Sequence, residues 1–214
     1  MLARELADVF ARERATALVL DLTAPAVLVE NLILVHHIIR ASEDLLIAAS
    51  GAILRGNGSP FDERLRSYYI KHFSEELDHA KWLTADLASV GVDPLDVMPR
   101  QCIIDLVGGQ YYLVKHVHPV ALLSYMAFLE WGAMPMSMVE ELESIHGTQL
   151  LRTIRHHSKH DIAHGNDLAE MLDAAPPQHH ALLIANGAHT PAAFYEAARD
   201  VAVSAIEREF KIGE

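Results

Sequence analysis

Three side chains of metal-binding type lie close together in the last third of the chain, within the segment from His156 to His164. His157, Asp161 and His164 are spaced four and three residues apart, and a helix turns by about 100° per residue, so they share one face. That face also carries residues typical of a protein core, namely Leu150, Thr153, Ile154, Leu168 and Met171. An unpartnered buried carboxylate costs several kcal/mol, which a divalent metal bound by these side chains would offset. The alternative is a pair of core histidines oriented by Asp161.

A second inward-facing pair, Glu76 and His79, lies within a long helical pattern over residues 60–90. The spacing Glu-x-x-His is the one by which helix bundles present two ligands of a di-metal site from one helix. The stripe that contains the pair also holds Leu65, Tyr69, His72, Leu83, Leu87 and Val90. Glu75 lies nearer the edge of this stripe and is the second choice for the glutamate. A surface ion pair is the alternative interpretation.

Single glutamates stand in the hydrophobic stripes of two further expected helices, Glu43 in residues 26–54 and Glu130 in residues 118–132. The neighbours of Glu43 on its stripe are Leu32, His36, Ile39, Leu46, Ile47 and Leu54. Those of Glu130 are Leu123, Met126, Ala127 and Met134. A glutamate among so many apolar side chains is unusual for an ordinary surface position. Positions at a helix end or facing a loop are the alternative.

Seven ligand-type side chains from four expected helices are therefore predicted to face the interior. They are Glu43, Glu76, His79, Glu130, His157, Asp161 and His164. Four carboxylates and three imidazoles suit two divalent iron or manganese ions in a bundle core, with carboxylates available to bridge them. One such helix would be expected by chance, but the agreement of four favours a metal site.

The elements that must position these residues are helices, because proline, glycine and capping residues divide the chain into helical segments with almost no strand pattern. The expected helices cover residues 2–22, 26–54, 60–90, 100–117, 118–132, 135–145, 148–174, 178–186 and 192–211. Gly108 and Gly109 cost helix stability unless something approaches the backbone there or the helix kinks. With no repeat or linker, the sequence predicts one all-α domain over residues 1–214, a bundle of seven to nine helices.

Composition and charge argue against several classes of partner. The 214 residues have a formal net charge of -12 and no basic run, which disfavours nucleic acid and anionic membrane surfaces. Although 51% of residues are hydrophobic, the longest apolar runs are too short to span a bilayer, and residues 1–6 are amphipathic rather than a signal peptide. Cys102 is the single cysteine, so an intrachain disulfide is excluded and a cytoplasmic location is expected.

The motifs, in this order, resemble those of the haem-oxygenase-like di-iron oxidases, also called iron-containing redox enzymes. The matching blocks are FSEELDHAKWLTADL at residues 73–87, HPVALLSYMAFLE at residues 118–130, and His157-x-x-x-Asp161-x-x-His164. The family has a glutamate on an early core helix, a Glu and a His on the next, a lone Glu on a middle helix and the His-Asp-His motif on a late one. The seven predicted ligands occupy those places, and the resemblance covers roughly residues 30–175.

The resemblance implies an all-helical haem-oxygenase-like fold and a non-haem centre of two iron ions, with manganese as the alternative metal. It implies an O₂-dependent oxidation of a small organic molecule, such as an amino-acid or fatty-acid derivative, and leaves room for a homodimer. Candidates for pocket or supporting roles are His36, Tyr69, His72 and Tyr125.

Three other functions remain open at this point. A ferritin-like ferroxidase would use Glu-x-x-His twice, whereas here the second copy is replaced by the motif of His157, Asp161 and His164. The thiaminase-like and quinone-cofactor-synthase-like branches of the superfamily keep the fold without metal. The thiaminase-like branch uses a cysteine nucleophile, and Cys102 has no evident base near it in the sequence. The third is a helical interaction module with structural histidines, which the metal content of the purified protein would distinguish from an oxidase.

Overall fold

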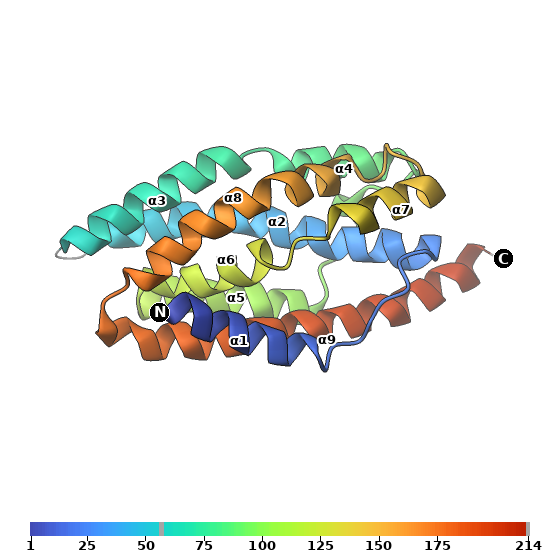
Figure 1. Cartoon of the computed structure of the whole chain (residues 1–214). Coiled ribbons are helices and arrows are strands. Elements are labelled where there is room, and N and C mark those ends of the chain that lie inside the picture. The colour runs from blue at the N-terminus through green and yellow to red at the C-terminus, as the bar shows by residue number, and fades with distance from the viewer. Residues whose placement is uncertain (56–57, 213–214) are drawn as a thin grey trace.

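The computed structural model describes residues 1–55 and 58–212, and within them every side chain except those of residues 161–163 and 207–212. The described part of the chain forms nine α-helices and three short 3₁₀ helices, with no strand, which confirms the predicted all-α class (Figure 1). The α-helices are α1 (Leu2–Arg14), α2 (Pro25–Ile53), α3 (Pro60–Glu76), α4 (His79–Ala88), α5 (Gln101–His116), α6 (Leu122–Glu130), α7 (Met136–His146), α8 (Arg152–Asp173) and α9 (His180–Ile212). No helix of the described residues is both long and apolar enough to cross a bilayer.

Helix α2 is the central element of the bundle. It packs against α3, α4, α5 and α9, and Figure 1 shows α3 and α4 end to end along one long edge with α9 along the opposite edge. A helix covered on most sides must be hydrophobic around most of its circumference. The apolar run from Leu32 to Val35 and the pair Leu45 and Leu46 meet that requirement, and nearly all of these residues are buried. At 1.5 Å per residue α2 is about 43 Å long, which lets one helix contact α3, α4, α5 and α9 along its length.

The predicted helix over residues 60–90 is wrong in one respect, because it is two helices that meet at Leu77 and Asp78. Asp78 has a φ of 73°, in the left-handed region that a non-glycine residue adopts at a cost of about 1 kcal/mol. Val90, predicted on the inward stripe, is exposed because α4 ends at Ala88 and Val90 lies in the turn that follows. The start of α3 agrees with the sequence, since Ser59 and Asp62 form a capping box.

Helix α8 begins at Arg152 rather than at residue 148, and a side chain of another helix caps it. Asp86 of α4 is buried and accepts hydrogen bonds from the Thr153 amide at 2.8 Å and the Thr153 hydroxyl at 2.7 Å. Its other oxygen accepts a 2.9 Å bond from Nε of Arg152. Because the first amides of a helix have no partner inside the helix, this carboxylate fixes where α8 starts. The register of α8 is thereby tied to α4.

Both ends of the chain also differ from the prediction. Helix α1 stops at Arg14 instead of continuing to residue 22, because the next large apolar side chains, Leu18 and Val19, are exposed and have no core to pack on. The two predicted helices over residues 178–186 and 192–211 are one helix, α9, which continues through Pro191. Proline removes a single helical hydrogen bond, and buried residues on both sides of it, such as Leu183 and Val201, hold the helix in place.

Gly108 and Gly109 lie in an uninterrupted part of α5. A Cβ atom added at either position would meet nothing within 4 Å. The expectation of a close contact at these glycines is therefore wrong.

Candidate metal centre

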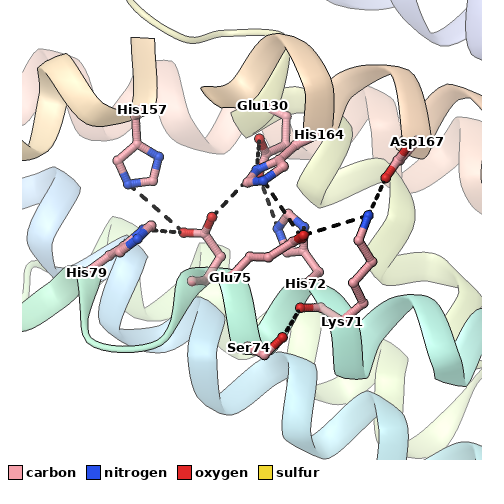
Figure 2. A network of polar contacts seen from close by, with 10 residues as sticks. Lys71, His72, Ser74, Glu75, His79, Glu130, His157, His164 and Asp167 are labelled. Atoms are coloured by element: carbon pink, nitrogen blue, oxygen red, sulfur yellow. Dashed lines mark hydrogen bonds and ion pairs between the residues drawn. The ribbon is translucent and has the colours of Figure 1, made fainter. Parts of the chain in front are cut away.

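Five of the seven predicted ligands lie together in the interior, where α3, α4, α6 and α8 face one another (Figure 2). They are Glu76 and His79 on either side of the α3–α4 break, Glu130 at the end of α6, and His157 and His164 on α8. His72 of α3 joins them. The six side chains form two groups, each of which could hold one metal ion.

The first group consists of His72, Glu76, Glu130 and His164. Nε2 of His72 lies 3.2 Å from Oε1 of Glu130, and Nδ1 of His164 lies 3.5 Å from Oε2 of Glu130. Nδ1 of His164 is also 3.7 Å from Oε1 of Glu76. Two imidazoles and two carboxylates from three helices thus point at one place.

The second group consists of Glu76, His79 and His157. Oε2 of Glu76 lies 2.9 Å from Nδ1 of His79 and 4.0 Å from Nε2 of His157. Since Oε1 of the same carboxylate faces His164, the two oxygens of Glu76 face different groups. The carboxylate of Glu76 is therefore shared between the two groups.

The donors and their spacing fit divalent metal ions. A metal ion forms bonds of about 2.1 Å to imidazole nitrogen or carboxylate oxygen, which puts neighbouring ligand atoms about 3 Å apart and opposite ones about 4 Å apart. Within each group of this protein, all ligand atoms lie within 4.8 Å of one another. Oε1 of Glu76, Oε2 of Glu130 and Nδ1 of His164 are buried without a hydrogen-bond partner among the described residues. Buried polar atoms are rarely left so, and a metal ion would satisfy all three.

The site perturbs the ionisation of its members in the protein without metal. Burial would raise the pKa of Glu130, but its contacts with His164 and His72 outweigh burial and lower it to about 2. The same contact with Glu130 raises the pKa of His164 to about 9. Burial opposes ionisation of Glu76 as well, yet the hydrogen bond with His79 and the charge of His157 lower its pKa. The two glutamates are therefore anions at neutral pH, the form that binds metal.

Of the other two predicted ligands, Glu43 belongs to neither group. Glu43 lies on α2 beside the start of α4, where the amides of Ala80 and Asp78 approach its carboxylate. Burial is the largest influence on Glu43 and raises its pKa. Oε1 of Glu43 is nonetheless buried without a hydrogen-bond partner among the described residues, and His79 is near enough to affect the carboxylate electrostatically, so its role as a ligand stays a prediction. The side chain of Asp161 lies outside the described residues.

His72 was expected in a supporting role and instead joins the first group. Its position four residues before Glu76 and seven before His79 was the available signal, because those spacings put all three on one helical face. Its ring also stacks on Tyr68, with centroids 5.8 Å apart and 25° between the planes. Glu75, the second choice for the glutamate, lies at the edge, with Oε2 3.7 Å from Nε2 of His164.

Contacts outside the groups hold α8 against its neighbours. Nζ of Lys71 donates a 2.5 Å hydrogen bond to Asp167 and so ties α3 to α8, as Figure 2 shows. Nε1 of Trp131 donates a 3.1 Å bond to the carbonyl oxygen of Gly165, next to His164. A Cβ atom at Gly165 would lie 2.9 Å from Cδ1 of Trp131, which is closer than atoms can pack. Glycine is required there so that the indole can lie against the backbone that carries His164.

A cavity of about 490 Å³ adjoins both groups, and His72, Glu76, Glu130 and His157 form part of its wall. The rest of the wall is mostly apolar and includes Val35, Ile38, Ile39, Leu46, Leu122, Met126, Leu129, Met134, Met138 and Ile154. Arg14, at the end of α1, and Asn31 of α2 add polar groups to it. A large apolar cavity with a few convergent polar groups is typical of a binding site for a small organic molecule.

The remaining candidates for supporting roles differ in position. Tyr125 lines the cavity, and its hydroxyl lies 3.2 Å from that of Ser42. Tyr69 is fully buried and donates to the carbonyl oxygen of Pro119 at 2.9 Å, which is a packing role. Nε2 of His36 lies 3.0 Å from the Thr84 hydroxyl. Burial lowers the pKa of His36 to about 4, so it is neutral at physiological pH.

No family model and no curated protein matches the chain. Among solved structures, one similar protein is a domain of unknown function with a heme oxygenase-like fold from Shewanella denitrificans OS217. The two superpose with a TM-score of 0.76 over 99% of this chain and 94% of the other, at 18% sequence identity. Such a likeness shows the fold, so the chain has an all-α haem oxygenase-like fold.

Proposed function

We propose that this protein is a non-haem oxidase or oxygenase that uses O₂ and two metal ions, iron or manganese, to oxidise a small organic molecule such as an amino-acid or fatty-acid derivative. The observation that carries the proposal is the position of Glu76, whose two oxygens face separate groups of imidazoles and carboxylates. Both groups border one apolar cavity. An organic substrate in the cavity would therefore lie beside the metal ligands.

When bound, two ferrous ions supply the electrons and open coordination positions that O₂ needs in order to react. The protein's own groups would hold the ions: His72, Glu130 and His164 would bind one, His79 and His157 would bind the other, and the carboxylate of Glu76 belongs to both groups. Contacts behind the ligands keep them oriented, notably those of Trp131 with Gly165 and of Lys71 with Asp167. The apolar wall excludes water and favours the binding of apolar substrate groups.

The shape and charge of the cavity favour an elongated, largely apolar substrate. Its wall follows α2 from Asn31 to Leu46, a distance of about 22 Å at 1.5 Å per residue. Arg14 gives the wall a cation that can pair with an acidic group of the substrate. A fatty-acid derivative matches both features more closely than a compact polar amino acid does.

A thiaminase-like reaction has less support, because it needs a reactive thiol. The thiol of Cys102 donates to Oδ2 of Asp200 at 3.3 Å, and burial and that carboxylate raise its pKa to about 11. The thiol is therefore protonated at physiological pH and a poor nucleophile. Cys102 is also absent from the cavity wall.

The test is metal binding followed by reaction with O₂. Protein freed of metal and titrated with Fe(II) without oxygen should bind close to two ions per chain and consume O₂ when air is admitted. His157→Ala and His164→Ala should each lower the stoichiometry, whereas His189→Ala, at an exposed position on α9, should not. Wild-type protein that binds no iron and consumes no O₂ would refute the proposal.

A further inference from the structure

Two histidines of α8 outside both ligand groups lie side by side at the surface. His156 and His160 are four residues apart, and their rings pack with centroids 4.2 Å apart. His160 is exposed and His156 is half-buried. Two histidines at this spacing on one helix face are a common way to bind a divalent transition metal.

The same pair is continuous with the interior. The ring of His156 lies 5.1 Å from that of His79 and 6.2 Å from that of His157, both members of the second ligand group. Trp82 packs beside this contact, with its ring 5.2 Å from His156 and 4.3 Å from His79. A row of imidazoles thus runs from solvent at His160, through His156, to the buried group.

The cavity is a poor alternative route for a metal ion. Away from the four ligand side chains its wall is mostly apolar, so a hydrated dication crossing that part would lose water before it reached a ligand. Arg14 on that wall repels cations as well. The protein as a whole attracts cations, since its formal net charge is -12. The histidine row offers nitrogen ligands along the whole path.

We infer that His156 and His160 form an outer site for a divalent transition metal ion, which receives the ion from solvent and passes it to the Glu76–His79–His157 group. This inference rests on the proposed function, because it assumes that the inner groups bind metal. Two imidazoles completed by water bind an ion weakly enough to release it. The outer site therefore affects how fast the inner groups fill and leaves their final occupancy unchanged.

Cobalt(II) is a suitable probe, because its visible absorption changes when water ligands are replaced by imidazole and carboxylate. Metal-free wild-type protein, His160→Ala and His156→Ala would be mixed with Co(II) in a stopped-flow spectrometer, with His189→Ala as the exposed control. The two α8 variants should fill severalfold more slowly, while His189→Ala fills at the wild-type rate. Equilibrium dialysis should give all four proteins the same number of tightly bound ions, and wild type and His189→Ala one additional weak ion.

Filling of His160→Ala and His156→Ala at the wild-type rate would overturn the inference, even if two tight ions are bound. Loss of a tightly bound ion in His160→Ala would also overturn it, because His160 would then be a permanent ligand. Failure of the proposed function looks different, since wild-type protein would then bind no tight ion. Circular dichroism and the thermal midpoint of each variant establish that an effect on rate does not come from misfolding.

Discussion

The contact between His164 and Glu130 predicts that the metal-free protein loses stability as the pH rises above neutrality. The pKa of His164 is raised to about 9, mainly by the carboxylate of Glu130, so the folded chain binds this proton more tightly than the unfolded chain. A raised pKa contributes stability that is fully present below the unfolded value of about 6.5 and is lost as the pH passes through about 9. The affected window is therefore pH 6.5 to 9.

The size of the effect follows from the two pKa values. Each unit of difference corresponds to about 1.4 kcal/mol, so the rise from 6.5 to about 9 amounts to about 3 kcal/mol. The side chain of His164 is 15% exposed, so solvent reduces this value only slightly. Glu130 adds nothing in this window, because with a pKa of about 2 it stays ionised throughout. A folded domain is typically more stable than its unfolded chain by about 5–15 kcal/mol, so a loss of about 3 kcal/mol is a substantial fraction of that stability.

Urea unfolding of protein treated with a chelator, at intervals between pH 6 and 9.5, measures the effect. The unfolding free energy of wild type should fall by about 3 kcal/mol across the window. His164→Gln should remove most of that slope, whereas His189→Gln on α9 should keep it. Protein loaded with Mn(II) should also lose the slope, because the metal replaces the proton on His164. An equal slope in wild type and His164→Gln would refute the assignment of the effect to this contact.

Three further changes test other parts of the structure. Gly165→Ala should destabilise the protein by about 1–3 kcal/mol in denaturant unfolding, because the new methyl group would lie 2.9 Å from Trp131. Gly109→Ala is the control: a Cβ atom there meets nothing within 4 Å, so this variant should be as stable as wild type or more stable. Arg14→Gln should weaken binding of dodecanoate to the metal-free protein by about two- to fivefold and leave binding of dodecanol unchanged. Arg12→Gln, on the same helix, should change the affinity for neither ligand. An equal loss of affinity for both ligands in Arg14→Gln would argue against pairing of Arg14 with the carboxylate. Asp86→Ala should lower the unfolding free energy by at least about 1–3 kcal/mol, because the amide and hydroxyl of Thr153 lose their acceptor. Asp105→Ala, at an exposed position, is the control. Equal urea midpoints of unfolding for the two variants would contradict the capping role of Asp86.

Much of the candidate site could be predicted because helical periodicity determines which side chains face inward. Glu76, Glu130 and the two histidines of α8 were found by their apolar neighbours at positions three and four residues away. Most of those neighbours are buried in the structure, as Leu168 and Met171 show. The pattern reveals the inward face of each helix before anything is known about which helices are adjacent.

The errors arise where a residue's partner lies on another element. Nothing in the sequence marks Asp86 as a buried acceptor, yet it is 1% exposed and accepts hydrogen bonds from the start of α8. The break at Asp78 could not be foreseen, since no glycine or proline marks it. Periodicity describes one helix at a time and carries no information on such contacts.

The cap that Asp86 provides makes the first turn of α8 depend on another helix. Most helices fray from their ends one residue at a time, and their terminal amides exchange hydrogen with solvent quickly. The Thr153 amide is instead held by a buried carboxylate of α4, so it becomes free to exchange only when the two helices separate. Its exchange rate therefore reports a joint opening of α4 and α8, the same motion that would pull His79 away from His157.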